Sequence, residues 1–259
     1  MRLKDRVAIV TGGGGGLGAT YAQFMAREGA IVTVADLNAA GCEKTANTIK
    51  AEGGRCYPHP ADLTDPDQVA KLFATVLERH GRVDILVNNA GGDPIGGGTS
   101  KIEEVDVDHW DRIVDVNLKT AFLCCRAAAT PMKRQGYGKI VNVSSRAARS
   151  TGWFGAVSPE YSCSKAGVLA LTRHVAKELG PYGINVNTLV PSFTISGPRL
   201  QQAWDRMTKE EQENMLAQTP LRRLSTPEEL AKVVLFLVSD DSSYITGATI
   251  DVNGGSFMG

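Results

Sequence analysis

Short apolar runs alternate with amphipathic stretches along most of the chain. Residues 7–10 form the first apolar run, and residues 17–27 follow it with apolar positions at helical spacing. Later β-prone runs predict six further strands, at 31–35, 55–61, 83–87, 139–143, 185–190 and 248–252. Periodic stretches between them predict helices, at 39–52, 66–79, 102–115, 116–134, 160–179 and within 196–219.

This order of elements predicts one architecture. An unbroken alternation of strand and helix favours a parallel sheet with helices on both faces and right-handed crossovers. Because no proline-rich linker or internal repeat divides the sequence, we expect a single doubly wound α/β domain spanning residues 1–259. Ligands bind such a sheet in the crevice at the carboxyl ends of its strands.

A glycine-rich turn, Thr-Gly-Gly-Gly-Gly-Gly-Leu-Gly at residues 11–18, directly follows the first predicted strand. An isolated glycine run would also fit a flexible loop. Here glycines would let the backbone approach a ligand, and the free N–H groups of the next helix would bind a phosphate. Asp36 ends the second strand, 24 residues beyond Gly12, where dinucleotide folds place the carboxylate that binds the adenosine ribose.

Composition limits the classes of binding partner that the sequence leads us to expect. The 28 acidic and 28 basic residues balance, so charge gives no reason to expect nucleic acid or an anionic membrane as a partner. No apolar run approaches the roughly 20 residues needed to cross a bilayer. The five cysteines are odd in number and lack metal-ligand spacing, which predicts reduced cytoplasmic thiols and no metal site.

Tyr161 and Lys165 are one helical turn apart, so both side chains would project from one helix face. A tyrosine with a pKa near ~10 is a poor base at neutral pH unless a nearby cation favours the phenolate. An ammonium four residues away would supply that cation. Taken alone, such a pair also arises by chance.

Several motifs together make the sequence similar to one family, the short-chain dehydrogenases/reductases. The resemblance covers nearly the whole chain and follows the family's order: the turn at 11–18, Asn-Asn-Ala-Gly at 88–91, Asn117, the serine pair 144–145, and Tyr161 with Lys165. It implies a Rossmann-type fold with a seven-stranded sheet. It also implies hydride transfer between a nicotinamide and an alcohol or carbonyl carbon.

The resemblance assigns roles to these residues. Tyr161 would exchange a proton with the substrate, and Lys165 would lower the tyrosine's pKa and hold the cofactor ribose. Asn117 would hold a water that passes the proton on, although a helix asparagine is often only a buried hydrogen-bond partner. Ser145 is the expected donor to the substrate oxygen. Ser144 stays open, because the gap to Tyr161 is about three residues longer than is usual in the family.

The expected cofactor is NAD. A carboxylate at Asp36 would accept the ribose hydroxyl and repel a 2′-phosphate, and Gly15 and Leu37 stand where NADP-selective relatives carry a basic residue. Asp62 resembles the family's adenine contact, with a helix cap before Pro66 as the alternative. The expected cofactor residues are Gly12, Gly16, Leu17, Gly18, Asp36, Leu37, Asp62, Leu63, Asn89, Ala90, Gly91, Tyr161, Lys165, Pro191, Thr194 and Ser196.

The sequence indicates the substrate less specifically than it indicates the cofactor. A charged helical stretch at 196–219 suits a lid over the site. We hypothesise that an arginine there or in the loop before Tyr161 meets an anionic or highly polar substrate, with solvated arginines as the alternative. The expected substrate residues are Ser145, Arg146, Arg149, Trp153, Ser192 and Arg199.

The sequence thus favours an NAD-dependent dehydrogenase or ketone reductase acting on a small polyol, sugar or hydroxy acid. One alternative is a 3-oxoacyl thioester reductase of the same family. A dinucleotide-sensing or scaffold protein is the non-enzymatic alternative. The resemblance further implies a homo-oligomer, either a dimer or a tetramer. The reduced thiols predicted above place it in the cytoplasm.

Overall fold

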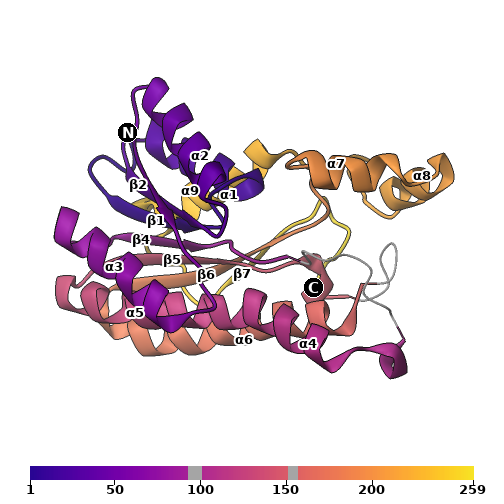
Figure 1. The fold of residues 1–259 in the computed structure, drawn as a ribbon. Helices are drawn as coiled ribbons and strands as arrows, with labels where there is room; N and C mark the ends of the chain where they lie inside the picture. The colour runs from indigo at the N-terminus through magenta and orange to yellow at the C-terminus, as the bar shows by residue number, and fades with distance from the viewer. Residues whose placement is uncertain (93–100, 151–156) are drawn as a thin grey trace.

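The protein, described by a computed structural model over residues 1–92, 101–150 and 157–259, is built on a seven-stranded parallel sheet (Figure 1). The strand order is β3-β2-β1-β4-β5-β6-β7. The strands are β1 Val7–Thr11, β2 Ile31–Asp36, β3 Arg55–Pro60, β4 Ile85–Asn88, β5 Gly138–Val143, β6 Ile184–Pro191 and β7 Thr249–Val252. This confirms the predicted doubly wound α/β fold.

Helices cover both faces of the sheet (Figure 1). One layer contains α1 Gly16–Arg27, α2 Ala39–Ala51 and α9 Pro227–Val238, and the other contains α3 Pro66–His80, α5 Thr120–Gln135 and α6 Pro159–Leu179. Strands between two helical layers are buried on both sides, as β1 and β5 are along their whole lengths. Such strands are nearly continuous apolar runs rather than alternating ones, as β1 is. Strand β5 also buries Lys139 and Asn142, which donate hydrogen bonds to Asn185 and Thr172. No helix in the described ranges is both long and apolar enough to span a bilayer.

The topology fixes where a ligand can bind. From β1 the chain builds outward through β2 and β3, and it then returns to the other side of β1 to build β4 to β7. The reversal between β1 and β4 opens a crevice at their carboxyl ends. The glycine turn after β1 and the Asn-Asn-Ala-Gly motif, which begins at the last residue of β4, meet at this crevice.

Two predicted helices were wrong in outline. The stretch 102–115 begins with a 3₁₀ turn, Ile102–Glu104, and its helix α4 covers only Val107–Val114. Asp106 sets that start, because its side chain accepts a hydrogen bond from the His109 N–H at 2.7 Å. The stretch 196–219 forms two helices, α7 Pro198–Asp205 and α8 Lys209–Ala217, because Thr208 starts the second with a capping box. Both helices project beyond the edge of the sheet (Figure 1).

Helix α9 was not predicted, although its sequence carries a clear start signal. Thr226 accepts a hydrogen bond from the Glu229 N–H, the Glu229 carboxylate accepts one from the Thr226 N–H, and Pro227 occupies the first helical position. Leu230 and Val234 then bury one face of α9 in the core that it shares with α1. The missing element was therefore readable from local sequence.

Candidate active site

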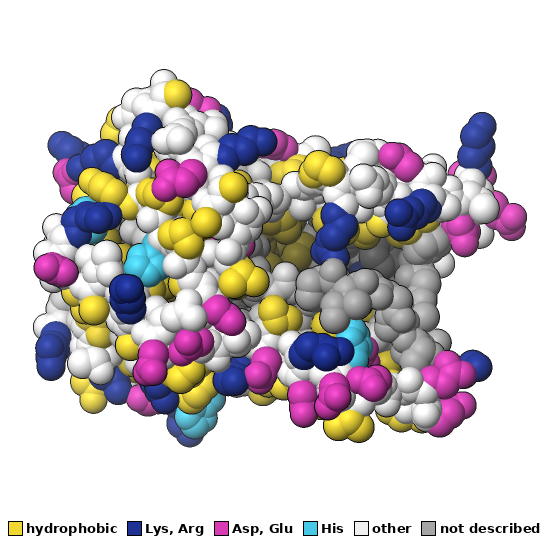
Figure 2. Space-filling model, viewed as in Figure 1, with side chains coloured by type: hydrophobic (Ala, Val, Ile, Leu, Met, Phe, Trp, Pro, Cys, Tyr) yellow, Lys and Arg dark blue, Asp and Glu magenta, His cyan; other side chains and the backbone are white. Residues whose placement is uncertain are grey.

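A cavity of about 770 Å³ follows the carboxyl ends of the strands from the glycine turn to α7. Figure 2 shows this face hollowed beneath α7 and α8, with hydrophobic side chains inside. Every predicted cofactor residue except Gly18 lines the cavity. Residues that sequence places far apart are thus brought to one site.

The glycine turn depends on conformations and close contacts that only glycine allows. Gly12 and Gly16 have φ angles of +63° and +53°. Gly18 lies in the first turn of α1, where an added Cβ would overlap the carbonyl oxygen of Gly12 and reach 2.7 Å from Asn89 Nδ2. Gly18 therefore lets the helix pack on the turn instead of lining the cavity. No side chain caps α1.

Side chains from β1 and β4 tie the turn to the neighbouring loop. The Thr11 hydroxyl accepts hydrogen bonds from the backbone N–H groups of Asn89 and Ala90, both at 3.0 Å. Asn89 Nδ2 donates in return to the carbonyl oxygens of Thr11 and Gly12 at 3.1 and 3.3 Å. The two loops that would hold a dinucleotide are therefore fixed to one another.

Two carboxylates lie at the same end of the cavity. Asp36 accepts hydrogen bonds from the Gly14 N–H at 3.0 Å and the Asn38 N–H at 2.9 Å, which orient its carboxylate. Asp62 accepts from the Thr64 N–H and hydroxyl at 2.9 and 2.7 Å. Asp65 caps α3, so the alternative of Asp62 as the helix cap is wrong.

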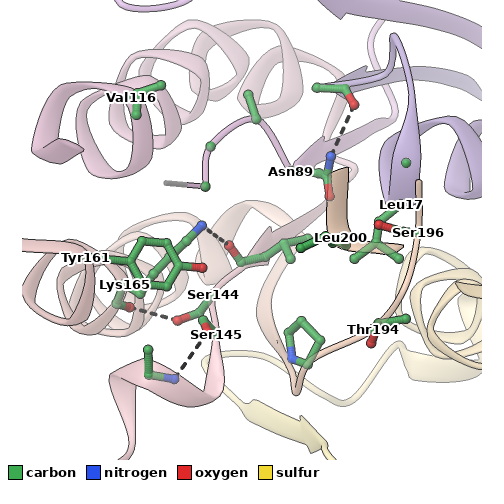
Figure 3. Close-up of a pocket in the computed structure, with 18 of the residues that line it drawn as sticks. Leu17, Asn89, Val116, Ser144, Ser145, Tyr161, Lys165, Thr194, Ser196 and Leu200 are labelled. Atoms are coloured by element: carbon green, nitrogen blue, oxygen red, sulfur yellow. Dashed lines mark hydrogen bonds between the residues drawn. The ribbon is translucent and has the colours of Figure 1, made fainter. Parts of the chain in front are cut away.

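Tyr161 and Lys165 project from α6 into the cavity (Figure 3). Lys165 Nζ lies 5.9 Å from the centroid of the Tyr161 ring and donates a hydrogen bond to the carbonyl oxygen of Val143 at 3.0 Å. Burial lowers the pKa of Lys165 to about 8, because its ammonium is removed from water. The pair predicted from sequence therefore forms, anchored to the end of β5.

The two strand-end serines have different partners (Figure 3). Ser144 is almost fully buried, and its hydroxyl donates to the carbonyl oxygen of Lys165 at 2.8 Å. The half-buried Ser145 oxygen accepts from the Ala147 N–H at 3.2 Å, an arrangement that does not use the hydroxyl proton. Both serines line the cavity, but the geometry favours Ser145 as the donor to a substrate oxygen.

Asn117 lies in a π-helical turn between α4 and α5 and does not line the cavity. Its Nδ2 donates to the carbonyl oxygens of Gly92 and Ile113 at 2.8 and 2.9 Å, and its Oδ1 accepts from the Gly92 N–H at 2.8 Å. Asn117 thus fixes the loop after β4. Its role in holding a water stays a prediction.

The end of β6 and the segment that follows it also turn toward the cavity. Pro191, Ser192, Thr194 and Ser196 all line it. Thr194 is buried, and its hydroxyl oxygen lies 2.6 Å from that of Ser225. A Cβ added at Gly16 would lie 3.4 Å from Ser196 Oγ, so this segment faces the glycine turn across the crevice.

The predicted substrate arginines separate into two groups. Arg146 and Arg199 line the cavity, whereas Arg149 does not. The Arg149 guanidinium pairs with Asp251 at 2.9 Å and lies over the Phe257 ring, so its assignment as a substrate contact is wrong. Trp153 lies outside the described residues.

Several lining residues were missed at the sequence level. The ones without a predicted role include Val116, Thr120, Ser150, Val157, Phe193, Leu200, Met207 and Met215. Leu200, Met207 and Met215 are apolar positions in an otherwise charged stretch, and that contrast could have identified them. These three side chains form an apolar wall of the cavity at its end beside α7 and α8.

Known proteins are similar to this chain over nearly its whole length. A family model described as enoyl-(acyl carrier protein) reductase matches residues 13–256. The (2S)-[(R)-hydroxy(phenyl)methyl]succinyl-CoA dehydrogenase subunit BbsD of Thauera aromatica is 37% identical over 98% of both chains. The D-beta-hydroxybutyrate dehydrogenase of Rhizobium meliloti is 35% identical over 96% of this chain and 98% of its own.

A solved structure extends the comparison. The 3-oxoacyl-[acyl-carrier protein] reductase with bound NAD from Brucella melitensis has a TM-score of 0.86 and 34% identity, covering 100% of this chain and 95% of that one. The chain belongs to the short-chain dehydrogenase/reductase family. It is an oxidoreductase that transfers a hydride between a nicotinamide cofactor and a secondary alcohol or ketone carbon.

The residues present fit a nicotinamide dinucleotide. The glycine turn provides a backbone surface that side chains would fill, and the cavity continues without interruption to Tyr161 and Lys165. The glycine turn would hold the diphosphate, and Asp36 and Asp62 would lie beside the adenosine.

Proposed function

We propose that the protein uses NAD rather than NADP and acts on a small polar substrate, namely a polyol, a sugar or a hydroxy acid. The orientation of Asp36 is the observation that carries the cofactor preference. Its carboxylate is held at the rim of the cavity by two backbone N–H groups, and its neighbour Leu37 is 76% exposed and uncharged. A 2′-phosphate there would meet a fixed negative charge, and positions 15 and 37 hold glycine and leucine instead of a basic residue.

The proposed chemistry uses three side chains. A bound nicotinamide supplies or accepts the hydride. Tyr161 donates its phenolic proton to the ketone oxygen during reduction, or removes the alcohol proton during oxidation. Ser145 donates a hydrogen bond to the same oxygen, and Lys165 favours the phenolate form of Tyr161. Lys165 is held in place by its bond to Val143.

The double variant Asp36→Ser/Leu37→Arg tests the cofactor preference. It removes the repelling carboxylate and adds a cation for the 2′-phosphate, so the ratio of kcat/KM for NADPH over NADH is expected to rise at least about 100-fold. Steady-state kinetics with both cofactors measures this ratio. Glu43→Ser, which removes an exposed acid of α2 outside the cavity, serves as the control. Equal use of both cofactors by the wild-type enzyme would contradict the proposal.

The serine assignment has its own test. Ser145→Ala is expected to lower kcat by roughly 100- to 1000-fold, the usual loss for one donor to a developing oxyanion. Ser144→Ala removes a bond to the α6 backbone and is expected to reduce the free energy of unfolding by about 1 kcal/mol, with a smaller loss of kcat. Kinetics and denaturant titration of both variants measure the two effects. The reverse pattern would assign the catalytic role to Ser144.

A 3-oxoacyl thioester reductase remains the second candidate, supported by the Brucella relative's activity and by the apolar wall of Leu200, Met207 and Met215. The two candidates differ in the substrate group beside the reacting carbon. Assays of a 3-oxoacyl N-acetylcysteamine thioester against small hydroxy acids and polyols compare them directly. A kcat/KM at least about tenfold higher for the thioester would favour the second candidate.

We further propose a cytoplasmic homo-oligomer, either a dimer or a tetramer, in which α7 and α8 act as a lid. Family resemblance supports pairing through α5 and α6, and exposed Val107 and Phe122 on α4 and α5 fit such an interface. All five cysteines are free thiols, which fits a reducing compartment. Light scattering during size-exclusion chromatography measures the oligomeric state.

A further inference from the structure

Tyr161 lies in the first turn of α6, which begins at Pro159. Helix ends open more readily than helix centres, because the N–H groups of the first turn have no acceptor within the helix. The Ser158 side chain, at the N-cap, makes no hydrogen bond to the N–H groups of this turn. Tertiary contacts must therefore keep the tyrosine ring in one position.

Contacts one turn further along hold α6 against the end of β5. Lys165 Nζ donates a hydrogen bond to the carbonyl oxygen of Val143 at 3.0 Å, and the Ser144 hydroxyl donates to the carbonyl oxygen of Lys165 at 2.8 Å. These bonds fix the helix on the C-terminal side of Tyr161. A separate contact, made with α4, lies on its N-terminal side.

Glu160, the residue directly before Tyr161, makes this second contact. Its side chain is 1% exposed, and its Oε1 lies 3.2 Å from Nε2 of His109, whose side chain is 15% exposed. Helices α4 and α6 pack against one another here (Figure 1). A buried carboxylate is costly unless a donor or an opposite charge faces it, and a protonated imidazole supplies both. The pair therefore ties the first turn of α6 to α4.

His109 is itself held at the start of α4. Its backbone N–H donates to the Asp106 side chain at 2.7 Å, which caps the helix. After α4 the chain continues into the π-helical turn that contains Asn117, whose Oδ1 accepts a hydrogen bond from the Gly92 N–H. Helix α4 is thus joined to the loop after β4, which borders the cavity, and the pair extends this connection to the turn that carries Tyr161.

We propose that Glu160 and His109 are positioning residues for hydride transfer. By holding the first turn of α6 against α4, the pair keeps the Tyr161 hydroxyl directed at the reacting oxygen of the substrate. Neither side chain is among the described residues that line the cavity, so both act through Tyr161. This inference rests on the role proposed above for Tyr161.

Two substitutions of one residue test the contact. His109→Leu removes the donor, whereas His109→Gln keeps an N–H group near the position of Nε2. His109→Leu is expected to lower kcat by about 10- to 100-fold, because a displacement of about 1 Å at a reacting group can cost that much. His109→Gln is expected to restore most of this loss. The affinity for NADH is expected to stay within about twofold in both variants.

The assay uses the substrate with the highest kcat/KM among the hydroxy acids, polyols and thioester. The control is Glu178→Leu, which breaks another ion pair of α6 at its far end, where Glu178 Oε1 lies 2.8 Å from Lys133 Nζ. This variant is expected to leave kcat within about twofold. Because His109→Leu leaves a buried carboxylate without its partner, thermal unfolding checks its fold. Glu160→Met removes the carboxylate itself and is expected to lose kcat to the same extent.

Amide hydrogen exchange shows whether the loss of kcat passes through the first turn. Exchange over residues 159–165, followed by mass spectrometry, is expected to become roughly tenfold faster in His109→Leu and Glu160→Met. It is expected to stay at the wild-type rate in His109→Gln and Glu178→Leu. This measurement needs no substrate.

The outcomes separate this inference from the proposed function. A kcat of His109→Leu equal to that of Glu178→Leu, an equal loss in His109→Gln, or a loss without faster exchange would overturn the positioning role and leave the role of Tyr161 intact. Retention of kcat by Tyr161→Phe, or no turnover of any substrate by the wild-type enzyme, would overturn the proposed function and this role with it. Lower kcat with faster exchange, confined to His109→Leu and Glu160→Met, supports both.

Discussion

Replacing Tyr161 by phenylalanine is expected to lower kcat at least about 1000-fold, because the variant keeps the ring and loses the proton that the reaction transfers. The affinity for NADH is expected to change little, since the glycine turn and Asp36 are unaltered. Stopped-flow or steady-state kinetics measures kcat, and quenching of protein fluorescence by NADH measures affinity. The loss should therefore appear in turnover and not in binding.

The control for this variant is Tyr182→Phe. Tyr182 is 46% exposed, lies in the 3₁₀ turn that follows the C-terminal end of α6, and does not line the cavity. The same chemical change there is therefore expected to leave kcat within about twofold. If Tyr161→Phe retained more than a tenth of wild-type kcat, another group would have to supply the proton.

Adding one methyl group at Gly18 is expected to disrupt cofactor binding. In Gly18→Ala the new Cβ would overlap the carbonyl oxygen of Gly12, and backbone in a tight turn cannot move away as a flexible side chain could. We expect a loss of about 1–3 kcal/mol in the free energy of unfolding. A displaced turn is expected to weaken NADH binding by roughly 100-fold. Calorimetric titration and denaturant unfolding measure both effects.

Two further glycines provide controls for the fold. A Cβ at Gly15, in the same turn, or at Gly180, far from the site, would have no neighbour within 4 Å. Gly15 has an extended backbone with a φ of 176°, and Gly180 a helical one with a φ of −52°, so alanine is sterically acceptable at each. Both variants are expected to unfold within about 0.5 kcal/mol of the wild-type free energy. If Gly18→Ala behaved like them, the turn would not require glycine there.

The sheet and most of its helices could be predicted because their signals are local. Strands such as β1 are buried on both faces and therefore are nearly continuous apolar runs. The glycine turn and Asp36 were recognised from spacing, and the Tyr161–Lys165 pair from its place among the family's motifs. The doubly wound topology brings them to one edge of the sheet. Sequence order alone was sufficient for this part of the site.

Other features depend on partners distant in sequence. Arg149 was expected to bind substrate, but Asp251, 102 residues away, takes its guanidinium. The distinction between Ser144 and Ser145 depends on a hydrogen bond from β5's end to the α6 backbone. These contacts cannot be predicted from hydrophobic periodicity or motif spacing, because they form only when the helices and strands pack together. The omission of α9 differs, because its capping box was present in the sequence.

Deuterium transfer tests the central claim most directly. NADH deuterated at both C4 positions is incubated with the enzyme and an oxo acid, and the product is analysed by mass spectrometry and proton NMR. The account predicts one deuterium at the carbinol carbon of the hydroxy acid, formed by the wild-type enzyme and nearly absent with Tyr161→Phe. A product without deuterium at that carbon, or equal labelled product from both enzymes, would contradict it.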